Sequence, residues 1–405
     1  MGLFKKQIVG GLDIDYSETI IINNTSRWII NQRENISFSV EDGFIKSSTD
    51  NSVTFPNSIA FADADKIQTC HISENGNGLF QTEDNKLYLV DYLCNSITEK
   101  TVTGLSIHTP SNASFPGRYF YTHKYMTPQD TNVYCWINYC NVNYGASPTN
   151  IYYTTDNFNT IKLAYEFGQN PAYYDDGTAD GGSTGTPLGD SGNSVVTRHG
   201  HSVEYNPNTG KWICVTGDSN KTFPVADEIH WLEGTYTEET DSWVWNVLNF
   251  GFSLEQNTRY KVGEGFFYDG YYYYCTDITS ATSTDEGGIW RVSDTSLNDP
   301  TKHQKIISVR TSTEVISAIK LDPNTRNILF TLADYADSPV AIKYIGVAKE
   351  LGFGTVDYYT VEGADFIRPS SINNNGYFRL DYDKFEPLQG RSYLLKIGDD
   401  LFNNL

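Results

Sequence analysis

The feature that most constrains this chain is a segment that occurs twice. Val203–Asp218 aligns without gaps with Ile319–Asp334, and each copy reads as a strand, an [Asn/Asp]-Pro-Asn-Thr turn and a second apolar strand ending in Asp. Pro presets φ for such a turn, and the Asn and Asp side chains bond to its backbone. The repeat therefore predicts two similar β-hairpins.

A shorter copy, Phe266–Asp277, lies between them, and its Asp-Gly pair is typical of a tight hairpin turn. The three closing aspartates, Asp218, Asp277 and Asp334, are 59 and 57 residues apart. A fixed period of this size with several strands per period is typical of β-propeller blades. Six steps of about 58 residues would fill residues 58–405, so six blades are favoured and seven are the alternative. Residues 1–57 are then a non-repeating β segment that closes the ring or anchors the chain on a partner.

The composition agrees with an all-β fold. The chain has 29 Tyr and 33 Gly but only 2 Met, with many Asn, Ser and Thr residues. Tyr and Thr favour half-buried strands, while Gly, Asn and Asp supply turns. Because 39% of the residues are hydrophobic, the chain can bury a substantial core.

The net charge of the chain argues against nucleic acid and anionic membranes as partners. A net charge of −21 repels nucleic acid and anionic lipid. The sequence shows no secretory signal at its start and no apolar run long enough to span a bilayer. We therefore expect neither nucleic-acid binding nor membrane insertion. The six cysteines show no metal-ligand spacing, which favours buried reduced thiols.

One short motif carries a family resemblance. Thr154, Asp156 and Thr160 are spaced like the Asp-box of sialidase-like propellers, although Phe158 stands where that family usually has Gly. In that family the Asp and the hydroxyl residues pin a turn between outer strands, away from the functional face. The resemblance thus implies a propeller fold and says little about activity.

Several arginines recur near the expected starts of blades and could converge on one polar pocket. Such a set would bind a carboxylate, sulfate or phosphate, since guanidinium groups bind these anions in a bidentate way. The alternative is that each arginine pairs with an acidic residue of a neighbouring blade. The candidate arginines are Arg118, Arg198, Arg259, Arg310 and Arg368.

The densest chemical cluster is Arg198-His-Gly-His201. Alternation along a strand would place His199 and His201 on one face, as a metal pair or an acid/base pair. Glu264 could lie nearby. The alternative interpretation is hydrogen bonding at the channel lining.

A Gly/Asp-rich stretch contains the only weak metal candidates, Asp176 and Asp180. Their spacing resembles the start of a calcium loop but lacks the bidentate Glu at the twelfth position. A surface insertion is therefore favoured, and no cofactor is expected beyond this weak possibility of calcium.

These observations leave three functional hypotheses. The first is a non-enzymatic virion component (a phage tail, nozzle, fibre or adhesin protein) assembled in the host cytoplasm, with other virion proteins and a host-surface glycan as partners. The Asn/Tyr/Thr-rich β composition resembles phage structural proteins. The alternatives are a glycan-active enzyme, either a polysaccharide lyase or a sialidase-like hydrolase acting on acidic sugars, and a bacterial glycan-binding propeller.

Overall fold

The structure is a computed structural model in which the regular secondary structure of the described residues consists of β-strands and short 3-10 turns. The residues it describes are 4–7, 29–50, 54–82, 86–103, 133–137, 149–168, 193–197, 199–217, 227–254, 257–278, 286–334, 342–361, 366–369, 377–383 and 391–396. Across these ranges no helix has the length and apolar character needed to cross a bilayer.

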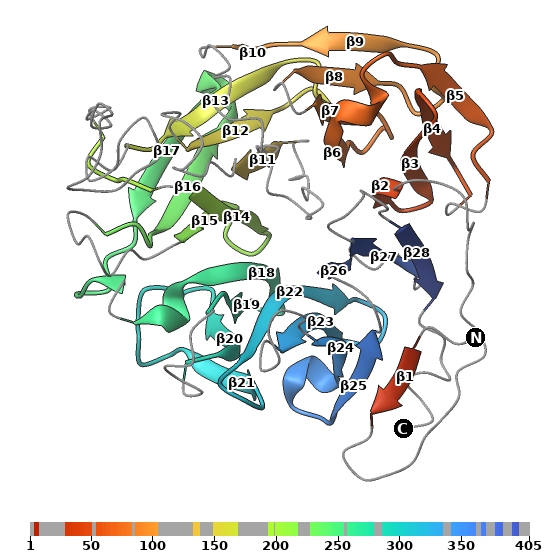
Figure 1. The fold of residues 1–405 in the computed structure, drawn as a ribbon. Helices are drawn as coiled ribbons and strands as arrows, with labels where there is room; N and C mark the ends of the chain where they lie inside the picture. Colours follow the sequence, from red (N-terminus) through yellow and green to blue (C-terminus); the bar gives the residue numbers. More distant parts are fainter. Residues whose placement is uncertain are drawn as a thin grey trace, which may run out of the picture.

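The described strands form seven sheets, numbered here in chain order, which Figure 1 shows arranged in a ring. Sheet 1 consists of β2 (Ile29–Arg33), β3 (Ile36–Glu41), β4 (Phe44–Ser48) and β5 (Asn57–Ala60). Sheet 2 consists of β6 (Ile67–Ile72), β7 (Gly78–Thr82), β8 (Leu87–Val90) and β9 (Ile97–Lys100). Sheet 3 consists of β11 (Tyr134–Ile137), β12 (Asn150–Thr154), β13 (Ile161–Glu166) and β10 (Val102–Thr103).

The second half of the ring has the same organisation. Sheet 4 consists of β14 (His199–Asn206), β15 (Lys211–Gly217), β16 (Trp231–Thr237) and β17 (Ser242–Val247). Sheet 5 consists of β18 (Val262–Tyr268), β19 (Tyr271–Thr276), β20 (Gly288–Ser293) and β21 (Gln304–Ser308). Sheet 6 consists of β22 (Glu314–Asp322), β23 (Asn327–Asp334), β24 (Ile342–Ala348), β25 (Val356–Val361) and β1 (Phe4–Gln7). Sheet 7 consists of β26 (Phe366–Pro369), β27 (Tyr377–Asp383) and β28 (Arg391–Lys396). The 3-10 turns are η1 (Ala64–Lys66), η3 (Glu238–Thr240), η5 (Thr258–Tyr260) and η6 (Glu350–Gly352).

The arrangement is that of a β-propeller. Within each sheet, strands that follow one another in the chain pair antiparallel and are arranged from the centre of the ring outward (Figure 1), while in sheet 3 the outer strand β10 pairs parallel with β13. The innermost strands of neighbouring sheets are in contact, β14 with β18, β18 with β22, and β22 with β26. The all-β propeller predicted from the repeat is confirmed.

The described strands give seven sheets, the number in the seven-blade alternative, rather than the favoured six. The 58-residue step was derived from sheets 4 to 6, whereas the innermost strands of sheets 1 and 2 begin fewer residues apart, at Ile29 and Ile67. The expected boundary between residues 57 and 58 falls inside β5, so the propeller sheets begin earlier than expected. Nearer the N-terminus, β1 pairs antiparallel with β25 and adds an outer strand to sheet 6.

The sequence repeat corresponds to the two inner strands of sheets 4 and 6. In the first copy the N–H of Gly210 donates to the carbonyl of Asn206 at 2.9 Å, and in the second Arg326 donates to Asp322, also at 2.9 Å. Gly210 and Arg326 both have positive φ, at 70° and 61°. The two hairpins predicted from the repeat are therefore confirmed, with the same turn in each.

The hydrophobic core is divided into layers between neighbouring sheets. Phe38 and Phe80 join sheets 1 and 2 with ring centroids 5.2 Å apart in an edge contact. Trp231 of sheet 4 is fully buried and packs edge-on against Tyr272 and Tyr274 of sheet 5. Because each layer takes side chains from two sheets, neighbouring sheets stabilise one another.

The innermost strands share a local irregularity. The pairing register shifts by one residue in β2, β6, β14, β18 and β22. In β14 the extra residue is His201, and in β18 it is Gly263. A β-bulge of this kind increases the local twist and redirects a side chain. The bulges thus decide where the polar residues of the inner strands point.

Candidate functional site

The structure describes only part of the predicted site. Arg118, Arg198, Asp176 and Asp180 lie outside the described residues. His199 lies in β14 and Arg368 in β26, each placed by its backbone alone. The side chains that can be followed are those of His201, Arg259, Glu264 and Arg310.

His201 lies at the bulge of β14 and is buried. Its Nδ1 is 2.5 Å from the carbonyl oxygen of Val262 in the innermost strand of the next sheet. The ring lies directly over Gly217, where a Cβ would come within 2.2 Å of it. The bulge changes the side-chain alternation of β14 at His201, and a common face for His199 and His201 stays a prediction. His201 therefore links sheet 4 to sheet 5.

Glu264 makes the corresponding link from sheet 5 to sheet 6. Its Oε1 pairs with Lys320 Nζ at 2.6 Å, and its Oε2 accepts the N–H of Ile319 at 2.9 Å. Both charged side chains are 6% exposed. Burying two charges is favourable only when they pair closely and their remaining polar atoms are bonded. Both carboxylate oxygens of Glu264 are thus occupied by inter-sheet bonds.

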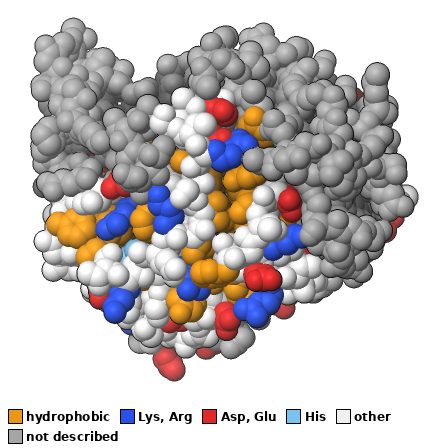
Figure 2. Space-filling view, turned by 90° about the horizontal axis from the view of Figure 1, so that it is seen from below, with side chains coloured by type: hydrophobic (Ala, Val, Ile, Leu, Met, Phe, Trp, Pro, Cys, Tyr) orange, Lys and Arg blue, Asp and Glu red, His pale blue; other side chains and the backbone are white. Residues whose placement is uncertain are grey.

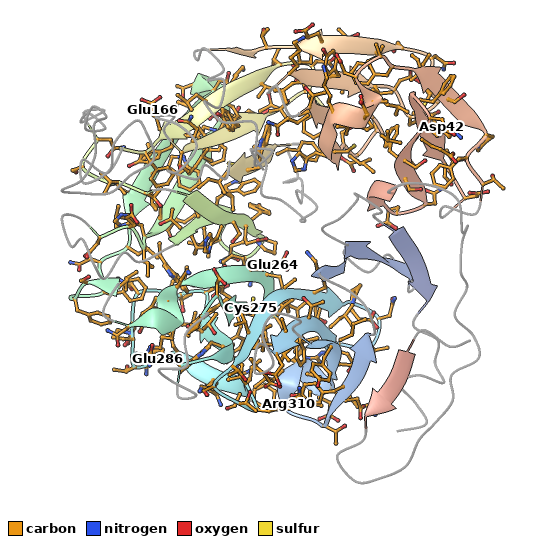
Figure 3. The ribbon with its side chains drawn as sticks, in the orientation of Figure 1. Asp42, Glu166, Glu264, Cys275, Glu286 and Arg310 are labelled. Carbon is orange, nitrogen blue, oxygen red and sulfur yellow. The ribbon has the colours of Figure 1, made fainter. Side chains whose placement is uncertain are left out.

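The two candidate arginines whose side chains are described, Arg259 and Arg310, contact different residues. Figure 3 shows Arg310 at the lower edge of the ring and Glu264 near its centre. Arg310 Nε donates to Glu314 at 2.6 Å, and its guanidinium stacks on Tyr344 of the same sheet at 4.4 Å. Arg259 lies over Trp290 of sheet 5 at 5.4 Å. Arg310 thus pairs with an acidic residue four positions along the chain, and both a shared arginine pocket and arginine pairs between neighbouring blades stay predictions.

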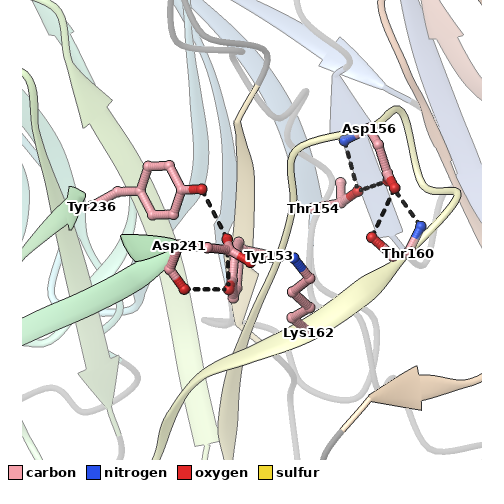
Figure 4. Close-up of polar contacts among 7 residues, drawn as sticks. All are labelled: Tyr153, Thr154, Asp156, Thr160, Lys162, Tyr236 and Asp241. Atoms are coloured by element: carbon pink, nitrogen blue, oxygen red, sulfur yellow. Dashed lines mark hydrogen bonds and ion pairs between the residues drawn. The ribbon is translucent and has the colours of Figure 1, made fainter. Parts of the chain in front are cut away.

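A polar cluster that the sequence did not predict joins the outer parts of sheets 3 and 4 (Figure 4). Tyr153 and Tyr236 donate to Asp241 Oδ1 at 3.1 and 2.9 Å, and Lys162 forms an ion pair with Asp241 Oδ2. Burial acts to raise the pKa of Asp241, but the bonds from Lys162, Tyr236 and Tyr153 hold it below its usual value. We call these four residues the Asp241 cluster. Its carboxylate is occupied on both oxygens, so the cluster fastens two sheets together.

Asp156 fixes the turn between β12 and β13 through bonds from its side chain. Asp156 Oδ1 accepts from Thr154 Oγ1 and from the N–H of Thr160, at 2.9 and 2.8 Å, as Figure 4 shows. The same pattern occurs around Asp50, which accepts from Ser48 Oγ at 2.6 Å and from the N–H of Thr54 at 2.9 Å. Both turns lie between strands, where the carboxylate bonds fix the backbone.

The described residues contain no group of three or more His, Cys, Asp or Glu side chains placed to hold a metal ion. Within the same ranges the cysteines are buried free thiols, at Cys70, Cys94, Cys135, Cys214 and Cys275. Burial raises the pKa of the Cys135 and Cys214 thiols well above their usual value. These thiols remain protonated and are poor nucleophiles at neutral pH.

Comparisons with known proteins bear on the fold. No family model matches the chain, and neither does any curated protein. Among solved structures, YCF48 bound to a D1 peptide is similar over 95% of this chain and 97% of its own, with a TM-score of 0.50 and 11% identity. YCF48 from Cyanidioschyzon merolae covers 98% of this chain and 99% of its own, with a TM-score of 0.45 and 12% identity. Dihydro-heme d1 dehydrogenase NirN covers 89% of this chain and 73% of its own, with a TM-score of 0.40 and 9% identity. At such identities the first similarity supports the propeller fold alone.

Proposed function

We propose that this chain is a non-enzymatic propeller that serves as a structural or receptor-binding component of a virion, of the tail, nozzle, fibre or adhesin type. Its partners are other proteins of the particle and a glycan on the host surface. The observation that carries the non-enzymatic part is the use of the candidate acid/base groups in bonds between sheets.

General acid or base catalysis needs a group that can reach a substrate proton. Glu264 has both oxygens bonded inside the fold, and His201 has Nδ1 at the Val262 carbonyl. Both residues are almost completely buried. Their positions favour a role in joining neighbouring sheets over one in lyase or hydrolase chemistry.

A role in binding fits the scaffold. YCF48, whose solved structure has a similar fold, is bound there to a D1 peptide, so a propeller of this kind can present a protein-binding surface. The Asn-, Tyr- and Thr-rich β composition supports the virion assignment. The Asp156 turn supports a relation to Asp-box propellers. The alternative function is cleavage of acidic glycans.

The proposal can be tested by particle fractionation. Cells expressing the chain from its native genome are lysed, particles are separated on a density gradient, and the chain is followed by an antibody. We expect it to band with intact particles and to label them in immunogold electron microscopy. Recovery only as free 45.6 kDa protein, with none in the particle fractions, would overturn the virion assignment.

A further inference from the structure

The outer contact between sheets 5 and 6 is built on the same plan as the contact between sheets 3 and 4. Tyr153 and Arg291 both stand third in a segment with the pattern Ile-aromatic-x-x-[Ser/Thr]-Asp. Each pairs across to the adjoining strand, Tyr153 with Lys162 and Arg291 with Gln304. The two cross-strand pairs therefore occupy corresponding places in their sheets.

Each pair faces the residue that ends a 3-10 turn in the next sheet. Asp241 follows η3 and Phe353 follows η6. Their N–H groups donate to the first carbonyl of the turn, that of Glu238 or Glu350, each at 3.1 Å. Asp241 and Phe353 are thus equivalent positions, one occupied by a carboxylate and the other by an aromatic ring.

Because Phe353 stands where the other junction has Asp241, Arg291 lacks the carboxylate partner that Lys162 has there. The Arg291 guanidinium lies between the rings of Tyr271 and Phe353, 4.4 and 4.3 Å from their centroids. Its Nε and Nη2 both donate to Gln304 Oε1, at 3.2 and 3.0 Å, and it also bonds to the phenol of Tyr273.

Among the described residues no carboxylate forms an ion pair with Arg291. The nearby Asp269 pairs with Arg326 instead, at 3.2 Å. Phe353 is 52% exposed, Gln304 is exposed and Arg291 is partly exposed, so the group is open to solvent. Figure 2 shows hydrophobic and basic side chains intermixed on this side of the molecule, the lower edge of Figure 1.

We infer that Arg291, Gln304, Tyr271 and Phe353, termed here the Arg291 clamp, bind the carboxylate of an acidic sugar. The ligand carboxylate supplies the negative charge that Asp241 supplies in the other junction. Gln304 Oε1 accepts from Arg291, which leaves its amide N–H groups to donate to the ligand. This inference names the ligand class for the glycan-binding part of the proposed function and rests on it.

The surroundings favour a sugar over other anions. Two rings hold the guanidinium in place, so little side-chain freedom is lost on binding. The exposed ring of Phe353 offers an apolar surface on which the C–H face of a sugar can stack. In a chain of net charge −21, an anionic ligand is repelled over most of the surface and is attracted where a cation lacks a built-in counter-ion.

The test is a titration of the purified full chain with 3′-sialyllactose and glucuronate oligosaccharides, with lactose as the neutral comparison and hexaglutamate as the peptide comparison. We expect at least one carboxylated sugar to bind more tightly than lactose. Arg291→Gln should weaken that binding about tenfold or more, the effect of losing a charge-assisted bond. Phe353→Asp should have the same effect, because it supplies a carboxylate to Arg291 from within the chain.

The matched control is Lys162→Gln, which removes the cation of the Asp241 cluster and should leave sugar binding unchanged. Equal binding of lactose and the carboxylated sugars, wild-type binding by Arg291→Gln, or binding of hexaglutamate alone would each overturn the inference. None of these results affects the particle assignment, whereas cleavage of the sugars by the wild type would overturn the non-enzymatic function itself.

Discussion

Removing the Glu264 carboxylate should be among the most destabilising single changes in this protein. Glu264 and Lys320 are each 6% exposed, and their atoms are 2.6 Å apart across the contact between sheets 5 and 6. Breaking a buried pair by removing one partner costs about 3–5 kcal/mol. Loss of the acceptor for the Ile319 N–H adds about 1 kcal/mol. For Glu264→Ala we therefore expect the free energy of unfolding to fall by about 4–6 kcal/mol, a large part of a typical total.

The assay is urea denaturation followed by tryptophan fluorescence and far-UV circular dichroism, with Lys320→Met as the complementary single variant. The double variant Glu264→Leu/Lys320→Met removes both charges and should recover most of the loss, since apolar replacement of a buried pair is often neutral. A cost below about 1 kcal/mol for each single variant would refute the reasoning, because that is the range of exposed ion pairs. So would a double variant as unstable as the sum of the singles.

Two further predictions concern the loss of stability at acidic pH and the contribution of the Asp156 turn to stability. Burial lowers the pKa of His71 to about 3 and that of His303 to about 4, so the unfolded chain protonates first as the pH falls below 6.5. The stability from each neutral histidine is complete above pH 6.5 and should drop by about 2 kcal/mol between pH 6.5 and 5, measured as urea midpoints. The variant His71→Asn should show a shallower fall, and an identical slope would contradict this. Asp156→Ala should cost about 1.5–3 kcal/mol through its lost turn bonds, and a thermal melt unchanged from wild type would show that the turn does not depend on them.

The repeat predicted the hairpins well because their signals are local. Pro and Asn at fixed turn positions determine the backbone there, and the bonds at Gly210 and Arg326 are the same in both copies. The number of sheets was harder to predict, since the period came from sheets 4 to 6 and the innermost strands of sheets 1 and 2 begin closer together, at Ile29 and Ile67.

The polar links between sheets could not be read from the sequence, because they join residues far apart in the chain. Tyr153 and Asp241 are separated by 88 residues, and Lys162 and Asp241 by 79. The bulge at His201 adds one residue to a strand without a distinctive pattern, so it could not be read from the sequence. A repeat-based comparison of Ile151–Asp156 with Ile289–Asp294 is the one signal that would have directed attention to Arg291.

We propose that His201 and Glu264 hold the propeller together and perform no chemistry. This proposal is tested most directly by incubating the purified chain with sialylated and uronate-containing polysaccharides and following the products by NMR. We predict no free sialic acid, no unsaturated uronate and no new reducing ends. Product formation by the wild type that is abolished in a folded Glu264→Gln or His201→Ala variant would contradict the account.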